Sequence, residues 1–379
     1  MDARDQPLVS VVIPTRNAGP QFLRLLQIIH SQRVPREIEV VVIDSMSKDG
    51  TPDLARSFGA SVLSIQKNCF NHGRARNWAI RKSAGEFVAL TVQDALPTDE
   101  HWLSNLLDPL LQDSLVAGSY GLQEAPTSAG LLERACSLLW RGQNQHPLVK
   151  SLETPAAFDE MSPPQRLELI RFDNVTSCVR RTVWQELPFP ERNYGEDIAW
   201  AKRALLEGLR LAYVPAARVW HYHERGWMYQ LRRAYLDGYA RAELVEWPAP
   251  GLSFRAALGL LRALISLIRN KTFDAMVEPS TIQKYLERES IRCESLGLKG
   301  LTKPYCDGLA FSQALLRRAL TISDAERLPE GSWANLLRFS MVGAVGRSLG
   351  ATGRTKLNSG TFIERIEWSL LHQLLSRGV

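Results

Sequence analysis

Two aspartates stand where hydrophobic runs end early in the chain, a position suited to ligand binding. Asp44 closes the run IEVVVID, and Asp94 follows FVALTVQ. The Asp44 carboxylate can accept a hydrogen bond from a pyrimidine N–H, and Ser45 begins the small polar run behind it. Asp94 offers the oxygen that a hard divalent cation prefers. The structural alternative is that Asp44, like Asp49, caps the helix that follows.

A group of polar residues follows Gly73 at the predicted start of a helix. Arg74, Arg76 and Asn77 stand there. Guanidinium groups near a helix N-terminus favour a diphosphate, because their charge and the helix dipole act in the same direction. Arg74 also has an interpretation as a solvated surface residue.

An acidic pair opens another predicted helix. Glu196 and Asp197 follow Gly195, and the helix runs to about Glu207. Acidic residues are favoured in a first helical turn by the macrodipole alone, which is the structural interpretation. The same dipole predicts a depressed pKa for a carboxylate there. Such a group would be ready to accept a proton at neutral pH.

Two histidines are separated by one residue, His221-Tyr222-His223. Residues two apart on a strand point to the same face, so both rings could reach one metal ion if the strand continues to His223. The alternative is that either ring is an ordinary core or surface histidine.

The elements that must position these residues alternate between strand and helix. Pro14 is expected to end the first strand, and Pro52 fits a first helical position. Strands are predicted at 9–13, 38–44, 61–65 and 87–92, and helices at 22–30, after 51 and at 72–83. This order predicts a mostly parallel sheet with helices on both faces. Ligands of such sheets bind beyond the carboxyl ends of the strands, where Asp44 and Asp94 stand.

The rest of the chain divides into three stretches. Residues 121–170 are rich in proline and predict a long excursion that partly covers the site. A compact strand–helix pattern returns at 173–219. After about residue 245 the sequence predicts helices broken by Gly and Pro, which gives two domains, 1–245 and 246–379. No internal repeat is visible.

Composition excludes several classes of protein. The 379 residues are 45% hydrophobic and 23% charged, which is typical of a globular chain. A net charge of +6 suits a phosphate-bearing substrate or an anionic membrane surface, but is too dispersed to favour nucleic acid. Five scattered cysteines without C-x-x-C spacing predict free thiols. The N-terminus lacks a signal-peptide pattern, and a cytoplasmic location is expected.

Five segments occur together in one order: VSVVIPTRN, VVIDSMSKDGT, FNHGRARNWAI, FVALTVQDA and NYGEDIAWAKRALLEG. The set resembles glycosyltransferase family 2, and most closely its rhamnosyltransferase-like branch, over roughly residues 8–240. The resemblance implies a GT-A fold, which is an α/β sheet flanked by helices. It also implies an enzyme that uses a nucleotide sugar.

The resemblance implies roles for residues of the nucleotide site. The Asp that matches Asp44 reads the base in the family, and the first strand-to-helix turn lines the nucleotide pocket. The motif ending in Arg-Asn matches Arg76-Asn77. The nucleotide-sugar-binding residues are therefore expected to be Pro14, Thr15, Arg16, Asn17, Asp44, Ser45, Arg76, Asn77, Gln93 and Asp94.

The resemblance also implies a metal site and a base. Gln93-Asp94-Ala95 occupies the place of the family's Asp-x-Asp motif, a departure that the rhamnosyltransferase-like branch shares. Asp94, His221 and His223 are the expected ligands of Mg²⁺ or Mn²⁺, with His221 favoured over His223. The family's general base matches Asp197, and Glu196 beside it would orient the acceptor.

The implied function is inverting transfer of a deoxyhexose such as rhamnose from a nucleoside-diphosphate donor, with a dTDP-sugar favoured. The acceptor would be a glycan or a lipid-linked glycan of an envelope polysaccharide. A nucleotidyltransferase would need a Gly-rich basic loop that VVIPTRNAGP lacks. A processive synthase would need a Gln-x-x-Arg-Trp motif and membrane spans. The non-enzymatic alternative is a silent GT-A scaffold that binds nucleotide or partner glycosyltransferases.

The segment 251–270 carries Arg255, Arg262 and Arg269 seven residues apart. On a helix these side chains form one polar stripe, and arginine every second turn disfavours a transmembrane span. Two interpretations stay open. The helix lies on an anionic leaflet, which would make the protein peripheral on the inner face of the membrane, or it packs against the catalytic domain or a second subunit.

Overall fold

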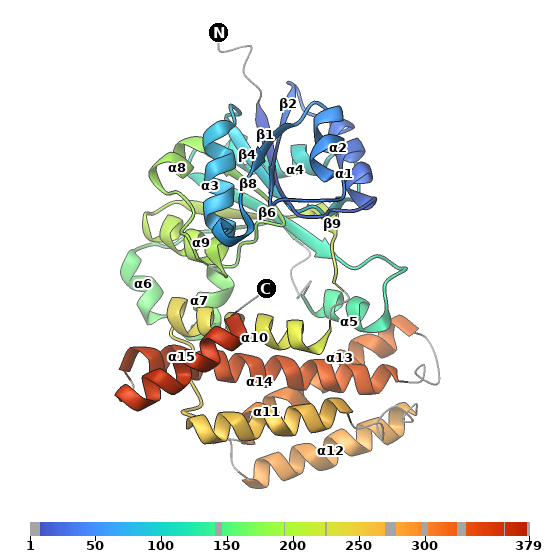
Figure 1. Cartoon of the computed structure of the whole chain (residues 1–379), viewed down its shortest axis with the longest axis vertical. Helices are drawn as coiled ribbons and strands as arrows, with labels where there is room; N and C mark the ends of the chain where they lie inside the picture. The colour runs from blue at the N-terminus through green and yellow to red at the C-terminus, as the bar shows by residue number, and fades with distance from the viewer. Residues whose placement is uncertain are drawn as a thin grey trace. The chain divides into compact units, whose positions relative to one another are not determined.

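The computed structural model describes residues 8–140, 146–192, 194–223, 226–269, 278–296, 302–323, 331–359 and 361–376. Contacts divide the chain into two compact units (Figure 1). The first contains residues 1–126 and 141–222. The second contains 127–140 and 223–379. Compared with the predicted boundary near 245, this division assigns two further segments, 127–140 and 223–245, to the second unit.

The N-terminal half of the sheet is parallel, in the order β3-β2-β1-β4. Its strands are β1 Val9–Thr15, β2 Ile38–Asp44, β3 Ser61–Ser64 and β4 Phe87–Thr91. All seven positions of β1 are buried, as expected for an apolar strand covered on both faces. The predicted strands are confirmed, although β1 continues through Pro14 to Thr15. Register places Thr15 beside Asp44 at the carboxyl edge.

The other half of the sheet is mixed in direction. Its strands are β5 Leu96–Pro97, β6 Val116–Glu124, β7 Leu148–Lys150, β8 Thr176–Arg180 and β9 Arg210–Trp220. β8 runs antiparallel to both β4 and β6, and β9 runs parallel to β6. β5 and β7 pair with β9 in the antiparallel sense. The predicted α/β class is confirmed, with its parallel order concentrated in the first four strands.

Helices cover this sheet because their apolar stripes match its buried strands. Figure 1 shows α1 and α2 to one side of β1 and β2, and α3 to the other. Buried Leu25, Leu106 and Trp102 belong to one hydrophobic cluster with the strands. The helices are α1 Gln21–His30, α2 Thr51–Ser57, α3 His72–Lys82, α4 Trp102–Gln112, α6 Pro155–Glu160, α7 Pro163–Leu169, α8 Arg181–Glu186 and α9 Glu196–Leu206, with a 3₁₀ turn at Lys67–Cys69.

Within the described residues of the second unit, the regular elements are all helices, as the sequence predicts beyond 245. Its helices are α5 Leu131–Trp140, α10 Trp227–Leu244, α11 Phe254–Arg269, α12 Pro279–Leu296, α13 Thr302–Ser323, α14 Ser332–Ser359 and α15 Phe362–Ser376. The long α14 packs against α10, α11, α13 and α15. Within the described helices, none combines the length and the apolar character that a bilayer crossing needs.

Candidate active site

The turns after β1 and β2 are tied to each other through Asp44. This residue is 2% exposed. Its carboxylate accepts hydrogen bonds from Thr15 Oγ1 at 2.9 Å and from the Ser47 backbone N–H at 2.8 Å, and it also accepts one from Ser47 Oγ. Asp44 therefore holds the walls of the expected base pocket. Its predicted contact with the base itself stays a prediction.

Further contacts fix the same two turns. The backbone N–H of Asn17 donates to Ser47 Oγ at 2.7 Å, and Asn17 Oδ1 accepts from the Lys48 N–H at 2.9 Å. The Ser45 N–H donates to the Thr15 carbonyl at 2.8 Å. Asn17 and Met46 both have positive φ, 45° and 58°. A positive φ is unfavourable for residues other than glycine. Its occurrence at Asn17 and Met46, after neighbouring strands, indicates that the surrounding hydrogen bonds enforce the backbone conformation of these turns.

Gln93 is bound to the backbone of Arg16. Its Oε1 accepts from the Arg16 N–H at 2.6 Å, and its Nε2 donates to the Arg16 carbonyl at 3.2 Å. A carboxylate, which is usual in the family at this position, could accept the hydrogen bond from the Arg16 N–H but could not donate one to the Arg16 carbonyl. Only an amide can make both hydrogen bonds. Gln93, which is expected to bind the nucleotide sugar and which follows β4, therefore holds the β1–α1 turn in place.

Arg76 lies buried against Glu196. The Arg76 Nη1–Glu196 Oε1 distance is 2.5 Å, and the two side chains are 4% and 7% exposed. Asn174 Nδ2 donates to the same carboxylate oxygen at 3.4 Å. Arg74 forms an exposed ion pair with Glu191 at 2.7 Å. Of the two arginines expected near a diphosphate, only Arg76 thus belongs to the carboxylate cluster at the start of α9.

Asn77 joins α3 to the segment that follows α8. Its Nδ2 donates to the Phe189 carbonyl at 2.7 Å, and its Oδ1 accepts from Trp184 Nε1 and the Phe189 N–H at 2.9 and 3.1 Å. Each polar atom of this side chain is therefore occupied by the protein. Its predicted role at the nucleotide stays a prediction, and its visible role is to hold α3 in place.

Asp197 has the opposite pKa shift from the predicted one. Burial, together with the negative charge of Glu196, raises the pKa of Asp197 to about 7, and Asp173 adds to the rise. The Ile198 N–H donates to Asp197 Oδ1 at 2.8 Å and acts in the other direction, as does Arg76. The predicted depression is wrong because a single N–H at the helix start is outweighed by desolvation and like charge.

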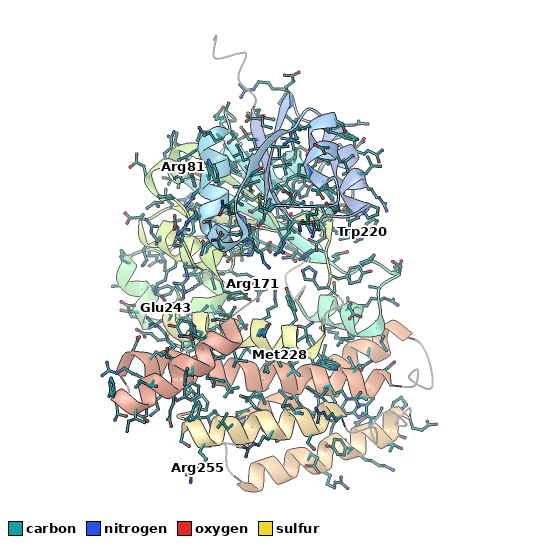
Figure 2. All side chains as sticks on the ribbon, in the orientation of Figure 1. Arg81, Arg171, Trp220, Met228, Glu243 and Arg255 are labelled. Atoms are coloured by element: carbon teal, nitrogen blue, oxygen red, sulfur yellow. The ribbon has the colours of Figure 1, made fainter. Side chains whose placement is uncertain are left out.

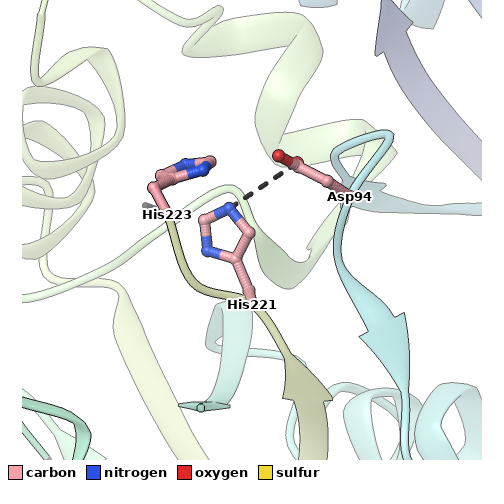
Figure 3. Close-up of side chains that lie close together, drawn as sticks. All are labelled: Asp94, His221 and His223. Atoms are coloured by element: carbon pink, nitrogen blue, oxygen red, sulfur yellow. Dashed lines mark ion pairs between the residues drawn. The ribbon is translucent and has the colours of Figure 1, made fainter. Parts of the chain in front are cut away.

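The three expected metal ligands lie together. One ligand atom each from Asp94, His221 and His223 falls within 4.8 Å of the other two. His221 Nε2 is 3.6 Å from Asp94 Oδ1, and these side chains are 8% and 20% exposed. Figure 3 shows the His221 ring directed at the Asp94 carboxylate, with His223 beside it. The rings converge although β9 ends at Trp220, before either histidine.

Strand pairing explains how Asp94 meets His221 from so far along the chain. Leu96 on β5 pairs with Trp220 on β9, so residues just before Leu96 and just after Trp220 become neighbours. Trp220, labelled in Figure 2, directly precedes His221. The His221 N–H also donates to the Glu124 carbonyl of β6 at 2.9 Å.

Sequence prediction missed Gln123, which contacts the histidine, and Asp173, which contacts Gln123. Gln123 Oε1 lies 2.7 Å from His221 Nδ1. Asp173 accepts a hydrogen bond from the Gln123 side chain, and burial raises the pKa of Asp173. A proton on His221 Nδ1 leaves the lone pair on Nε2, which faces Asp94. A carboxylate and correctly oriented imidazoles fit a divalent cation.

Comparison with known proteins relates the sequence to one family. Residues 10–146 match the family model described as Glycosyl transferase family 2. The O-antigen chain rhamnosyltransferase RfbN of Salmonella typhimurium is 30% identical over 220 residues, covering 57% of this chain and 66% of that protein. The O-antigen chain rhamnosyltransferase WbaN of Salmonella anatum is 27% identical over 220 residues, covering 57% and 67%. The matched region spans about two thirds of these relatives.

A solved structure is similar at lower identity. The mannosyltransferase PcManGT from Pyrobaculum calidifontis, in complex with GDP-Man and Mn²⁺, is 20% identical with a TM-score of 0.44 and covers 98% of this chain and 85% of that one. The mixed α/β sheet and the residues gathered at its edge define a glycosyltransferase domain of the GT-A type. Within that class, residues 10–146 match glycosyl transferase family 2, and the chain is similar to the two O-antigen chain rhamnosyltransferases.

Proposed function

We propose that this protein is an inverting glycosyltransferase that moves a deoxyhexose such as rhamnose from a nucleoside-diphosphate donor, with dTDP favoured. The acceptor is a glycan or lipid-linked glycan in envelope polysaccharide synthesis. Two relatives described as O-antigen chain rhamnosyltransferases support the sugar and the pathway class. The convergence of Asp94 and His221 at the carboxyl edge of a family 2 sheet is the observation that carries the proposal.

The transfer is a single displacement. Asp197 accepts the proton of an acceptor hydroxyl while that oxygen forms a bond to the anomeric carbon. The bond between the anomeric carbon and the diphosphate oxygen breaks, and the nucleoside diphosphate leaves with its electron pair. Burial and Glu196 raise the pKa of Asp197 to about 7, so its carboxylate accepts a proton more readily than an ordinary carboxylate does. Positioning of the two substrates supplies much of the remaining rate.

The residues around the donor have separate tasks. Asp94, His221 and His223 would hold a divalent cation, which when bound offsets the charge of the leaving diphosphate. Arg76 offers a second positive charge from α3, close to Glu196 at the start of α9. The turn at Arg16, held by Gln93, and the turn at Ser45 would enclose the nucleoside.

Nucleotide binding is the first test of this proposal. Thermal unfolding is measured with dTDP, UDP, GDP, ADP and CDP, each with Mn²⁺, Mg²⁺ or EDTA. A ligand at about 100 times its Kd should add roughly 2.7 kcal/mol to the free energy of unfolding. We expect selective stabilisation by dTDP that needs the metal. Stabilisation by none of them would favour a silent scaffold, and turnover of any donor sugar would exclude it.

We further propose that the protein works on the cytoplasmic side of the membrane and touches an anionic surface through α11. Arg255, Arg262 and Arg269 are all exposed on this helix. The buried positions Ala257 and Leu264 lie on its opposite face. A cationic stripe that points away from the packed face suits a leaflet on which a lipid-linked acceptor would lie.

A further inference from the structure

Gln123 is held in contact with His221 by the pairing of β6 and β9. After an irregularity beyond Tyr120, the register places Gln123 opposite Val219 and Glu124 opposite Trp220. The His221 N–H then bonds to the Glu124 carbonyl, and the imidazole turns its Nδ1 to Gln123. Both the backbone and the ring of this histidine are therefore positioned by β6.

Gly121 makes this close pairing possible. A Cβ at Gly121 would lie 1.9 Å from the Ala217 carbonyl oxygen and 2.8 Å from Thr176 Oγ1. Only a residue without a side chain allows β9 to approach β6 here. This close approach occurs two residues before Gln123 on the same strand. It therefore fixes where along β9 the Gln123 amide lies, and so its position beside His221.

Asp173 holds the other end of the amide. It accepts the hydrogen bond from Gln123, and its Oδ1 accepts from the Val175 and Thr176 N–H groups at 2.9 and 3.3 Å. Since the Gln123 Nε2 donates to Asp173, its Oε1 must face His221. An oxygen there can only accept, so the proton of a neutral His221 belongs on Nδ1.

We propose that Gln123 and Asp173 are positioning residues for the metal ligand His221. Asp173 sets the orientation of the Gln123 amide, and the amide sets the tautomer of the histidine. The result is an Nε2 lone pair that faces Asp94, ready for a cation. This inference rests on the proposed metal site. It assigns to two further side chains the orienting function that ligating histidines generally require.

Asp173 also connects the metal ligands to the base. Its charge contributes to the raised pKa of Asp197, and the charge of Arg76 acts on both aspartates. A chain of contacts therefore runs from Asp94 through His221 and Gln123 to Asp173 beside the base. The two parts of the site are adjacent through this residue.

The test is Gln123→Met, which keeps the length of the side chain and removes both polar ends. Mn²⁺ binding is measured by electron paramagnetic resonance without nucleotide, and we expect the affinity to fall about 10- to 100-fold. The ¹⁵N resonances of His221, assigned with His221→Gln, should show Nδ1–H in the metal-free wild type and lose that state in Gln123→Met. Gln112→Met, at the exposed end of α4, is the matched control and should bind Mn²⁺ like the wild type.

The Asp173→Asn variant separates the orientation of the Gln123 amide from the negative charge of Asp173. Its side-chain oxygen can still accept from Gln123, so we expect Mn²⁺ affinity to stay within severalfold of the wild type. A wild-type His221 that carries its proton on Nε2, or a folded Gln123→Met that binds Mn²⁺ as tightly as the wild type, would overturn the inference. If the wild type binds no Mn²⁺ but has Nδ1–H that Gln123→Met loses, the proposed metal site fails while the positioning of His221 by Gln123 stands.

Discussion

At the scale of the residue, the setting of Asp197 decides when it can act as a base. The first turn of α9 gives it one backbone N–H, yet burial and Glu196 favour the protonated form. Arg76, which pairs with Glu196, neutralises part of the negative charge of Glu196. A base with a pKa near 7 gains proton affinity and is ionised in only part of the molecules at neutral pH.

This shift predicts the pH dependence of transfer. A base works when it is deprotonated, so kcat/KM should rise as the pH increases through about 7 and fall tenfold per unit well below it. Asp197→Asn should lose transfer by at least about 100-fold, the lower end of what general-base catalysis supplies, and should keep nucleotide binding. Initial rates between pH 5.5 and 9 measure this. A flat profile or near wild-type turnover of the variant would remove Asp197 as the base.

Gln93 gives a second prediction at this scale. Gln93→Met removes both hydrogen bonds to Arg16 and frees the β1–α1 turn. With each bond worth about 0.5–1.5 kcal/mol, the loss of both should lower nucleotide affinity by roughly five- to 150-fold. Calorimetric titration with dTDP measures the change, with Gln112→Met as the control. Mn²⁺ affinity without nucleotide should change less than dTDP affinity, because both of these hydrogen bonds go to the Arg16 backbone. An unaltered dTDP affinity would contradict the role.

At the scale of the element, each unit contains a close approach between the backbones of two elements. β6 and β9 meet at Gly121 in the first unit, and α10 and α14 meet at Gly350 in the second. A Cβ at Gly350 would lie 1.9 Å from the Tyr235 carbonyl oxygen. Small residues at such crossings let two helices pack at a short distance, which side-chain volume would prevent.

Gly350→Ala should therefore destabilise the helical unit by about 1–3 kcal/mol, the usual cost of overpacking. Gly259→Ala is the matched control, because it is also a helical glycine of this unit and has nothing within 4 Å of its Cβ position. It should be neutral or stabilising by up to about 1 kcal/mol. Urea unfolding of the two variants measures the difference. Equal midpoints would mean that the α10–α14 crossing tolerates a methyl group.

At the scale of the whole molecule, the charge of α11 predicts association with membranes. Vesicles with anionic lipid should carry the protein in flotation, whereas zwitterionic vesicles should not. Replacing Arg255, Arg262 and Arg269 by glutamine should weaken binding strongly, since each charge near the surface is worth about 1 kcal/mol. High salt should have the same effect.

A control variant separates this stripe from net charge. Arg24, Arg81 and Lys82 are exposed residues of the first unit, and their replacement by glutamine changes the charge equally. That variant should float like the wild type. If neither variant nor salt affects flotation, or if the wild type does not float, the α11 stripe serves packing or a second subunit instead.

The sequence alone determined the strands and helices of residues 9–92 and most of the residues that end them. Apolar β-branched runs form β1, β2 and β4 because such residues suit a sheet buried on both faces, and that preference is local. The same pattern located Asp44 and Asp94, since a polar residue behind such a run must lie at the strand end.

Only the tertiary structure decided how these residues affect one another. The pKa of Asp197 depends on burial and on Asp173, and the orientation of His221 depends on Gln123. Asp94 meets His221 through the pairing of Leu96 with Trp220. These neighbours are far apart in the sequence, and desolvation and hydrogen bonding act through space at short range. No local pattern could therefore carry that information.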